Sequence, residues 1–132
     1  MSVKTYSGTA TSGRTELVLT AHVTDGKGVV VYIYGGELPH LGGAVLASPN
    51  LKPETTSGEG ELTVDIWSMT LPSHKDSKLA EIVAKHLASV LNESVLVSAG
   101  VHIDYASKDE IKGICDAAIS AANDFVSWYH NT

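Results

Sequence analysis

The feature that most constrains the fold is a change in the spacing of apolar residues after Leu71-Pro72. Before this point apolar side chains alternate with polar ones or form β-branched runs, which is typical of β-strands. Four strands are expected there, at residues 15–23, 29–34, 42–48 and 61–69. After it, apolar residues recur every three or four positions, which predicts an amphipathic helix ending near Leu91. A short strand at residues 94–99 follows, and the capping-box spacing of Ser107 and Glu110 predicts a second helix.

This order of four strands, a helix, a strand and a helix predicts an α+β fold, a mostly antiparallel β-sheet with both helices packed on one face. A tight turn is expected at residues 25–28, and a polar loop at residues 49–60. The run Val29–Tyr34 lacks polar alternation, so we expect this strand to lie centrally with both faces covered. The 132 residues, 43% of them hydrophobic, are expected to form a single domain, residues 1–132.

Charge and composition exclude several classes of protein. The net charge is -6 and the basic residues are scattered, which argues against a nucleic-acid partner. The N-terminus lacks the apolar core of a signal peptide, and no run approaches the roughly 18 apolar residues of a membrane span, so a cytoplasmic protein is expected. Cys115 is the single cysteine, which rules out an internal disulfide, and its apolar helical setting predicts a buried filler rather than a nucleophile.

Chemistry-bearing residues gather at three junctions between predicted elements. In the first, residues 35–44, four glycines flank Pro39-His40, so backbone can approach a ligand closely and offer consecutive N–H groups to a phosphate. The alternative to a phosphate site is a simple connecting loop that needs glycine for its backbone conformation and whose His40 faces solvent. The candidate binding residues are Gly35, Gly36, Glu37, Pro39, His40, Gly42 and Gly43.

The second junction, residues 72–76, opens the first predicted helix. Unpaired N–H groups and the helix dipole favour an anion there, and Lys75 adds a positive charge. The candidate binding residues are His74, Lys75 and Asp76. The alternative is ordinary helix capping by Ser73 or Asp76, with His74 exposed.

The third junction, residues 99–106, contains Gly100, His102 and Asp104 as binding candidates. His102 and Asp104 are two residues apart, so the carboxylate can orient the imidazole and raise its basicity, which makes this pair the catalytic candidate. A structural pair that stabilises the loop is the alternative. We expect the three junctions to converge on one pocket. The remaining histidines, His22, His86 and His130, are interpreted as structural or solvated.

No HExxH motif, GxSxG motif or pair of cysteines is present, so the sequence matches none of the standard motifs of hydrolases and zinc sites. No metal site is expected. The chain is therefore interpreted as a binding or accessory protein rather than a self-sufficient enzyme. Two other hypotheses stay open. One is a small metal-assisted hydrolase or isomerase that uses His40, His102 and Asp104. The other is an assembly chaperone for proteins that uses no small ligand.

The segments GGELPHLGGAVLA, LPSHKDSKLAE and VSAGVHIDYASKDEI resemble the small D subunit of gallate decarboxylase systems. The resemblance covers most of the chain in order, and it implies a fold similar to the proteasome assembly chaperones. It also implies an accessory protein that binds prenylated flavin mononucleotide (FMN) and assists its oxidative maturation or its delivery to a UbiD-type decarboxylase. The implied partners are that decarboxylase and its flavin prenyltransferase.

If the resemblance holds, amide nests and Lys75 would hold the phosphate, and apolar strand ends would cover the prenyl-derived part of the ligand. The polar edge of the flavin ring would then be met by His40, His74, His102 and Asp104. A two-fold homodimer is also expected, because the chain is small, rich in β-segments and carries Trp128 and Tyr129 near its end.

Overall fold

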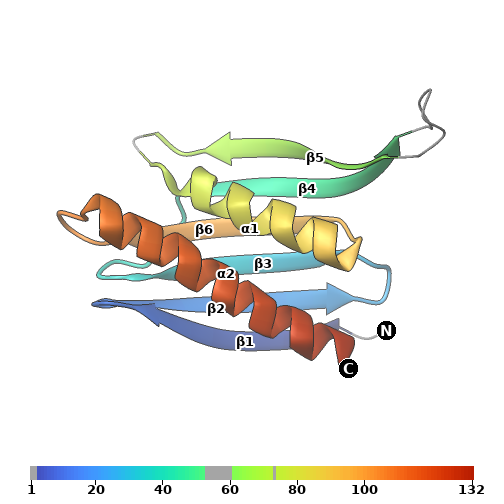
Figure 1. Ribbon diagram of the computed structural model, residues 1–132, viewed down its shortest axis with the longest axis horizontal. Coiled ribbons are helices and arrows are strands. Elements are labelled where there is room, and N and C mark those ends of the chain that lie inside the picture. The colour runs from blue at the N-terminus through green and yellow to red at the C-terminus, as the bar shows by residue number, and fades with distance from the viewer. Residues whose placement is uncertain (1–2, 53–60, 73) are drawn as a thin grey trace.

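The computed structural model describes residues 3–52, 61–72 and 74–132, which form one six-stranded sheet and two helices (Figure 1). The strands are β1 (Val3–Ser12), β2 (Thr15–Thr24), β3 (Val29–Gly36), β4 (Gly43–Lys52), β5 (Glu61–Thr70) and β6 (Val95–His102). The helices are α1 (Asp76–Leu91) and α2 (Lys108–His130). Every expected element is present. β1 is an additional strand that the sequence did not predict, because serine, threonine and glycine occupy much of it in place of apolar residues.

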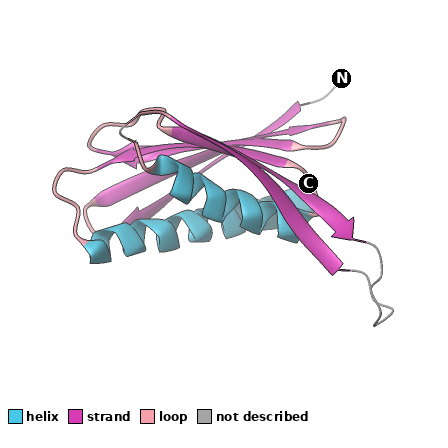
Figure 2. Ribbon diagram, turned by 90° about the horizontal axis from the view of Figure 1, so that it is seen from above, coloured by secondary structure: helices cyan, strands magenta, loops and turns pink. Residues whose placement is uncertain are grey.

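The strands lie in the order β1-β2-β3-β6-β4-β5. All neighbouring strands are antiparallel except β3 and β6, which are parallel. The fold class predicted from the sequence, a mostly antiparallel sheet with two helices on one face, is confirmed (Figure 2). The turn expected at residues 25–28 joins β2 to β3.

The core lies between the sheet and the two helices. Alternate residues of the central strands, such as Val31, Val45 and Val97, are fully buried, and Leu87 of α1 and Phe125 of α2 pack against this face. Burying each such side chain stabilises the fold by about 1.5–3 kcal/mol relative to exposure. Alanines take up much of the buried face of both helices, so the helices can lie close to the sheet: Ala80, Ala84, Ala88, Ala117, Ala118, Ala121 and Ala122.

Two details of the strand predictions are corrected. The expected loop at residues 49–60 begins later, because β4 continues through hydrogen bonding to β5 as far as Lys52; residues 53–60 lie outside the described residues. The second face of β3 is not covered by helices, since Val30 keeps 45% of its surface exposed.

The aromatic residues near the C-terminus do not form the exposed patch from which a dimer was expected. Trp128 and Tyr129 are partly buried and pack against the core. The Trp128 ring lies 5.4 Å from the ring of Tyr6 and 5.9 Å from that of Phe125. The contact between Trp128 and Tyr6 therefore packs the C-terminal part of α2 against β1.

The parallel pair β3 and β6 sets the position of the site. Gly36, the last residue of β3, lies opposite His102, the last residue of β6. Parallel neighbouring strands end at the same edge of a sheet, so the segments that follow both strands leave the sheet side by side. The first turn of α1 lies at this edge as well, because Asp76 contacts both His40 and Val101.

Candidate functional site

A cavity of about 780 Å³ lies where the segments after β3 and β6 meet the N-terminal turns of both helices. All three junction histidines line it. The ring of His40 lies 5.0 Å from that of His74 and 6.3 Å from that of His102. The expected convergence of the three junctions is therefore confirmed. Lys75 and Asp76 also line the cavity.

Asp76 joins the three junctions to one another. Its Oδ1 accepts a hydrogen bond from the backbone N–H of Val101 at 3.0 Å, and its Oδ2 lies 3.0 Å from Nε2 of His40. Its side chain is only 10% exposed. The alternative interpretation, helix capping by Asp76, is wrong, because Lys75 is the N-cap residue of α1 and its side chain makes no capping hydrogen bond. The other capping candidate, Ser73, lies outside the described residues. Asp76 is a structural centre of the site, with both carboxylate oxygens engaged by the protein.

His40 is fixed by two hydrogen-bond acceptors. Its Nδ1 donates to the carbonyl oxygen of Leu38 at 2.9 Å, and its Nε2 faces the carboxylate of Asp76. Only an imidazolium donates from both ring nitrogens. The pKa of His40 is accordingly raised, first by the Leu38 carbonyl and then by Asp76, against an opposing effect of burial. Both nitrogens are therefore used within the protein, and the face of the ring is what His40 can offer to a ligand.

The glycine-rich segment does not form the expected phosphate nest. The amides of Glu37, His40 and Gly42 donate to backbone carbonyls at the end of β6, at 2.7, 3.4 and 2.9 Å. Gly100 lies under this segment, and a Cβ there would overlap the carbonyl oxygen of His40. Gly36 has φ 78°, and a Cβ on it would overlap the carbonyl oxygen of His102. These glycines allow protein backbones to pack together.

The other glycine-rich candidates fit the same interpretation. Gly35 lies against the backbone of Glu16, Gly42 against the side chain of Asp76, and Gly43 against Ser77 at the start of α1. Pro39 is exposed in the connecting segment and does not line the cavity.

His74 and His102 each leave one ring nitrogen available. Nδ1 of His74 donates to the carbonyl oxygen of Pro72 at 2.7 Å. Nε2 of His102 lies 2.9 Å from Oδ1 of Asp104, so the expected pair is present. The hydrogen bond from His102 lowers the pKa of Asp104. Within the described residues no hydrogen bond engages Nε2 of His74 or Nδ1 of His102. These two nitrogens can exchange a proton or a hydrogen bond with a ligand.

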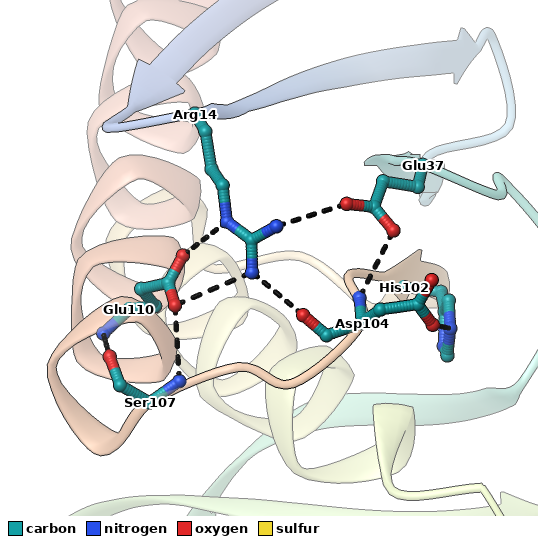
Figure 3. A network of polar contacts seen from close by, with 6 residues as sticks. All are labelled: Arg14, Glu37, His102, Asp104, Ser107 and Glu110. Atoms are coloured by element: carbon teal, nitrogen blue, oxygen red, sulfur yellow. Dashed lines mark hydrogen bonds and ion pairs between the residues drawn. The ribbon is translucent and has the colours of Figure 1, made fainter.

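Arg14, from the turn between β1 and β2, holds the loop that carries Asp104 (Figure 3). Its guanidinium contacts Oε2 of Glu110 at 2.6 Å, Oε1 of Glu37 at 3.0 Å and the carbonyl oxygen of Asp104 at 2.7 Å. Oε2 of Glu37 in turn accepts from the N–H of Asp104 at 3.2 Å. The hydrogen bond from Arg14 lowers the pKa of Glu110, whose carboxylate also closes the predicted capping box with Ser107.

Sequence reasoning missed Arg14. Its partners lie 23, 90 and 96 residues away, and a single arginine after a turn carries no local signal of such contacts. Glu37 was expected to bind a ligand. In the structure it spans Arg14 and Asp104, and it is not among the residues that line the cavity.

Most of the remaining lining of the cavity is apolar. It is formed by side chains of both helices and of the segment after β6, namely Leu79, Ile103, Ala106, Ile111, Ile114 and Cys115. The helical periodicity predicts that Leu79, Ile114 and Cys115 face the core. It does not predict that a cavity remains between them. Cys115, expected to be a buried filler, is only partly buried and lines the cavity, and burial raises the pKa of its thiol, which keeps it neutral.

The donor geometry gives no support to a metal centre. Among residues 3–52, 61–72 and 74–132, no group of three or more His, Cys, Asp or Glu side chains could hold a metal ion. His40, one of the ligands of the metal hypothesis, has both nitrogens committed to Leu38 and Asp76. No helix in the same part of the chain is long and apolar enough to span a membrane.

The fold defines a small α+β protein with the architecture of a proteasome assembly chaperone. The structure is similar to a chain of the crystal structure of a chaperone complex for yeast 20S proteasome assembly, with a TM-score of 0.60. The match covers 96% of this chain and 97% of that chain, at 15% identity, and therefore concerns the fold alone.

The sequence identifies the family. The family model described as the prenylated flavin chaperone LpdD-like domain matches residues 11–130, so the chain belongs to this family. A curated relative, Protein LpdD of Lactiplantibacillus plantarum (strain ATCC BAA-793 / NCIMB 8826 / WCFS1), is 24% identical over 106 residues. That match covers 78% of this chain and 70% of the relative. Family and relative support a chaperone role.

Proposed function

We propose that this chain is an accessory protein that binds prenylated FMN and assists its oxidative maturation or its delivery to a UbiD-type decarboxylase. The observation that carries the proposal is a single cavity whose lining combines two kinds of side chain. One kind is polar, three histidines and Lys75, and the other is aliphatic, from both helices and the segment after β6. Its volume, about 780 Å³, is in the range of cavities that hold cofactors and drug-sized ligands.

The polar residues of the lining suit the anionic and hydrogen-bonding parts of such a ligand. Lys75 and Lys78 lie at the start of α1, where the helix dipole also favours a phosphate. This arrangement replaces the amide nest expected from the glycines, whose N–H groups are engaged elsewhere. His74 and His102 would meet the polar edge of the flavin through their available nitrogens.

The apolar residues of the lining suit the hydrophobic part of the ligand. Ile103, Ile111 and Ile114 would cover the benzenoid edge and the prenyl-derived ring and would exclude water from them. The family resemblance implied that apolar strand ends would make this contact. In the structure both helices and the segment after β6 supply the aliphatic side chains, so the expected location of the apolar contact changes while its chemistry stays the same.

His102 is the residue to which we assign proton exchange. Asp104 accepts from Nε2 and leaves Nδ1 on the other side of the ring for the ligand. His40 is unsuited to this role because its nitrogens are occupied. Prenylated FMN, when bound, supplies a redox-active ring whose mature form is oxidised. The chain itself orients that ring, limits solvent access and holds or moves a proton at Nδ1 of His102.

The test is co-expression of each variant with a flavin prenyltransferase, anaerobic purification and measurement of bound flavin, followed by mixing with a decarboxylase. Lys75→Ala should weaken flavin retention about tenfold or more, as expected for loss of a charged hydrogen bond. His102→Ala should retain the flavin and yield less active decarboxylase. His130→Ala, an exposed histidine near the end of α2, is the matched control and should behave as wild type.

Flavin retention and decarboxylase activation equal to wild type in both Lys75→Ala and His102→Ala would contradict these roles. That result would favour a chaperone that acts on protein alone. Stoichiometric transition metal in the purified protein would instead favour the hydrolase or isomerase hypothesis.

A further inference from the structure

The face of the sheet opposite the helices carries large apolar side chains that stay exposed within the described part of the chain. Figure 2 shows both helices on one side of the sheet and none on the other. On the open side Val30, Leu46, Trp67 and Met69 are 45%, 40%, 58% and 68% exposed. Apolar residues scattered singly are ordinary on a protein surface, whereas a contiguous group marks an interaction site.

The strand register shows that these residues are contiguous. Val30 pairs with Leu96, Leu96 with Leu46, and Leu46 with Trp67, so one apolar row crosses β3, β6, β4 and β5. A second row runs beside it, composed of Tyr32, Ser98, Ala44 and Met69. We call these eight residues the open-face rows.

The open-face rows contain no Asp, Glu, Lys or Arg, although the whole chain has a net charge of -6. Two copies can therefore bring these rows together without like-charge repulsion, and Asp65, two residues before Trp67 on the same face of β5, lies beside the first row. Trp, Tyr and Met are also the residue types enriched at the centres of protein interfaces. In β3 the open face adds Tyr34, whose ring stacks on that of Tyr32 at 4.7 Å.

We infer that the open face binds a second copy of this chain, giving a two-fold dimer in which the two sheets pack face to face. The whole six-stranded face, of which the open-face rows form the apolar part across four strands, measures roughly 25 by 28 Å, or about 700 Å² per copy. The total of about 1,400 Å² lies within the roughly 1,200–2,000 Å² of stable specific interfaces.

The dimer also accounts for the composition of β3. Its run from Val29 to Tyr34 is typical of a strand covered on both faces, and the helices cover only one. A facing sheet would cover the other. The helices, which supply much of the apolar lining of the cavity, would lie on the outside of such a dimer, so the inference does not depend on the proposed ligand.

The first test measures mass by sedimentation equilibrium from 1 to 100 µM. Wild type should have twice the chain mass. Leu46→Glu, at the centre of the first row, should weaken self-association at least tenfold. Ile82→Glu is the matched control, because Ile82 is 42% exposed on α1, close to the 40% of Leu46. It should remain a dimer. A monomeric wild type at 100 µM, or a Leu46→Glu variant as dimeric as Ile82→Glu, would overturn the inference.

A second test does not depend on folding of the charged variant. The chain has two tryptophans, and Trp128→Phe leaves Trp67, on the open face, as the single fluorophore. Acrylamide quenching of Trp67 should be weak at 100 µM and rise as dilution dissociates the dimer. Strong quenching of Trp67 in a sample shown to be dimeric would place the dimer interface elsewhere and contradict the inference.

Discussion

Replacement of Asp76 should disconnect the three segments that form the cavity. Asp76→Ala removes the acceptor for both the Val101 N–H and Nε2 of His40. A buried donor left without its partner costs about 1–3 kcal/mol, and hydrogen bonds to charged groups lie in the upper part of that range. Because two donors lose their partner, we expect the free energy of unfolding to fall by about 3 kcal/mol.

Asp76→Asn separates the charge of Asp76 from its shape. The amide keeps the volume of the side chain and one acceptor oxygen, so it can still accept from Val101 or from His40, though not from both. We expect the free energy of unfolding to fall by about 1–2 kcal/mol. The pKa of His40 should move part of the way back toward 6.5, because the Leu38 carbonyl, the larger cause of its rise, remains.

Urea denaturation at constant pH measures the change in the free energy of unfolding. The pH dependence of the His40 ring resonances measures the change in the pKa of His40. Asp65→Asn is the control, since Asp65 is exposed on β5 and contacts only Asn50 among the hydrogen bonds described here. Surface changes of this kind stay within about 0.5 kcal/mol. If Asp76→Asn also stays within that range, and His40 titrates as in wild type, Asp76 does not organise the site.

Three further predictions follow from single contacts. The pKa of His40 is raised above 6.5, so its stabilising contribution is complete below pH 6.5 and is lost as pH rises through the raised pKa; urea denaturation at several pH values should show this loss in wild type and not in His40→Gln. Gly100→Ala should lower the stability of the protein by about 1–3 kcal/mol, because the added Cβ overlaps the His40 carbonyl. Gly26→Ala is the control, since its Cβ meets open space, and thermal denaturation of the two variants should show a loss only for Gly100→Ala. Arg14→Ala should speed amide hydrogen exchange severalfold in residues 103–107 and leave β2 unchanged; equal exchange in both proteins would show that Arg14 does not hold the loop.

The sequence predicted those parts of the fold that depend on local spacing. The alternation in β2 and the period of α1 follow from which residues face the core, and the capping box at Ser107 is a contact over three residues. β1 was missed because its serines and threonines carry little apolar signal; the strand pairs with β2 through its backbone and packs Tyr6 on α2.

The site was predictable in its location and not in its contacts. His102 ends β6, His40 follows β3 and His74 precedes α1, and the strand order brings these positions together. Asp76 contacts His40 and Val101, which lie 36 and 25 residues away in the sequence. Contacts at such separations cannot be predicted from residue spacing. The glycines illustrate the same limit. The sequence shows that something can come close to the backbone at a glycine, but not whether this is a ligand or another segment of the protein.

The most direct test of the proposed function is an anaerobic titration of the ¹⁵N-labelled chain with reduced prenylated FMN, followed by two-dimensional NMR. The account predicts saturable shifts of amides at the start of α1, the end of β6 and the first turns of α2, with the His74 and His102 ring resonances moving alongside them. Shifts confined to the open-face rows, or no shifts at millimolar ligand, would contradict it.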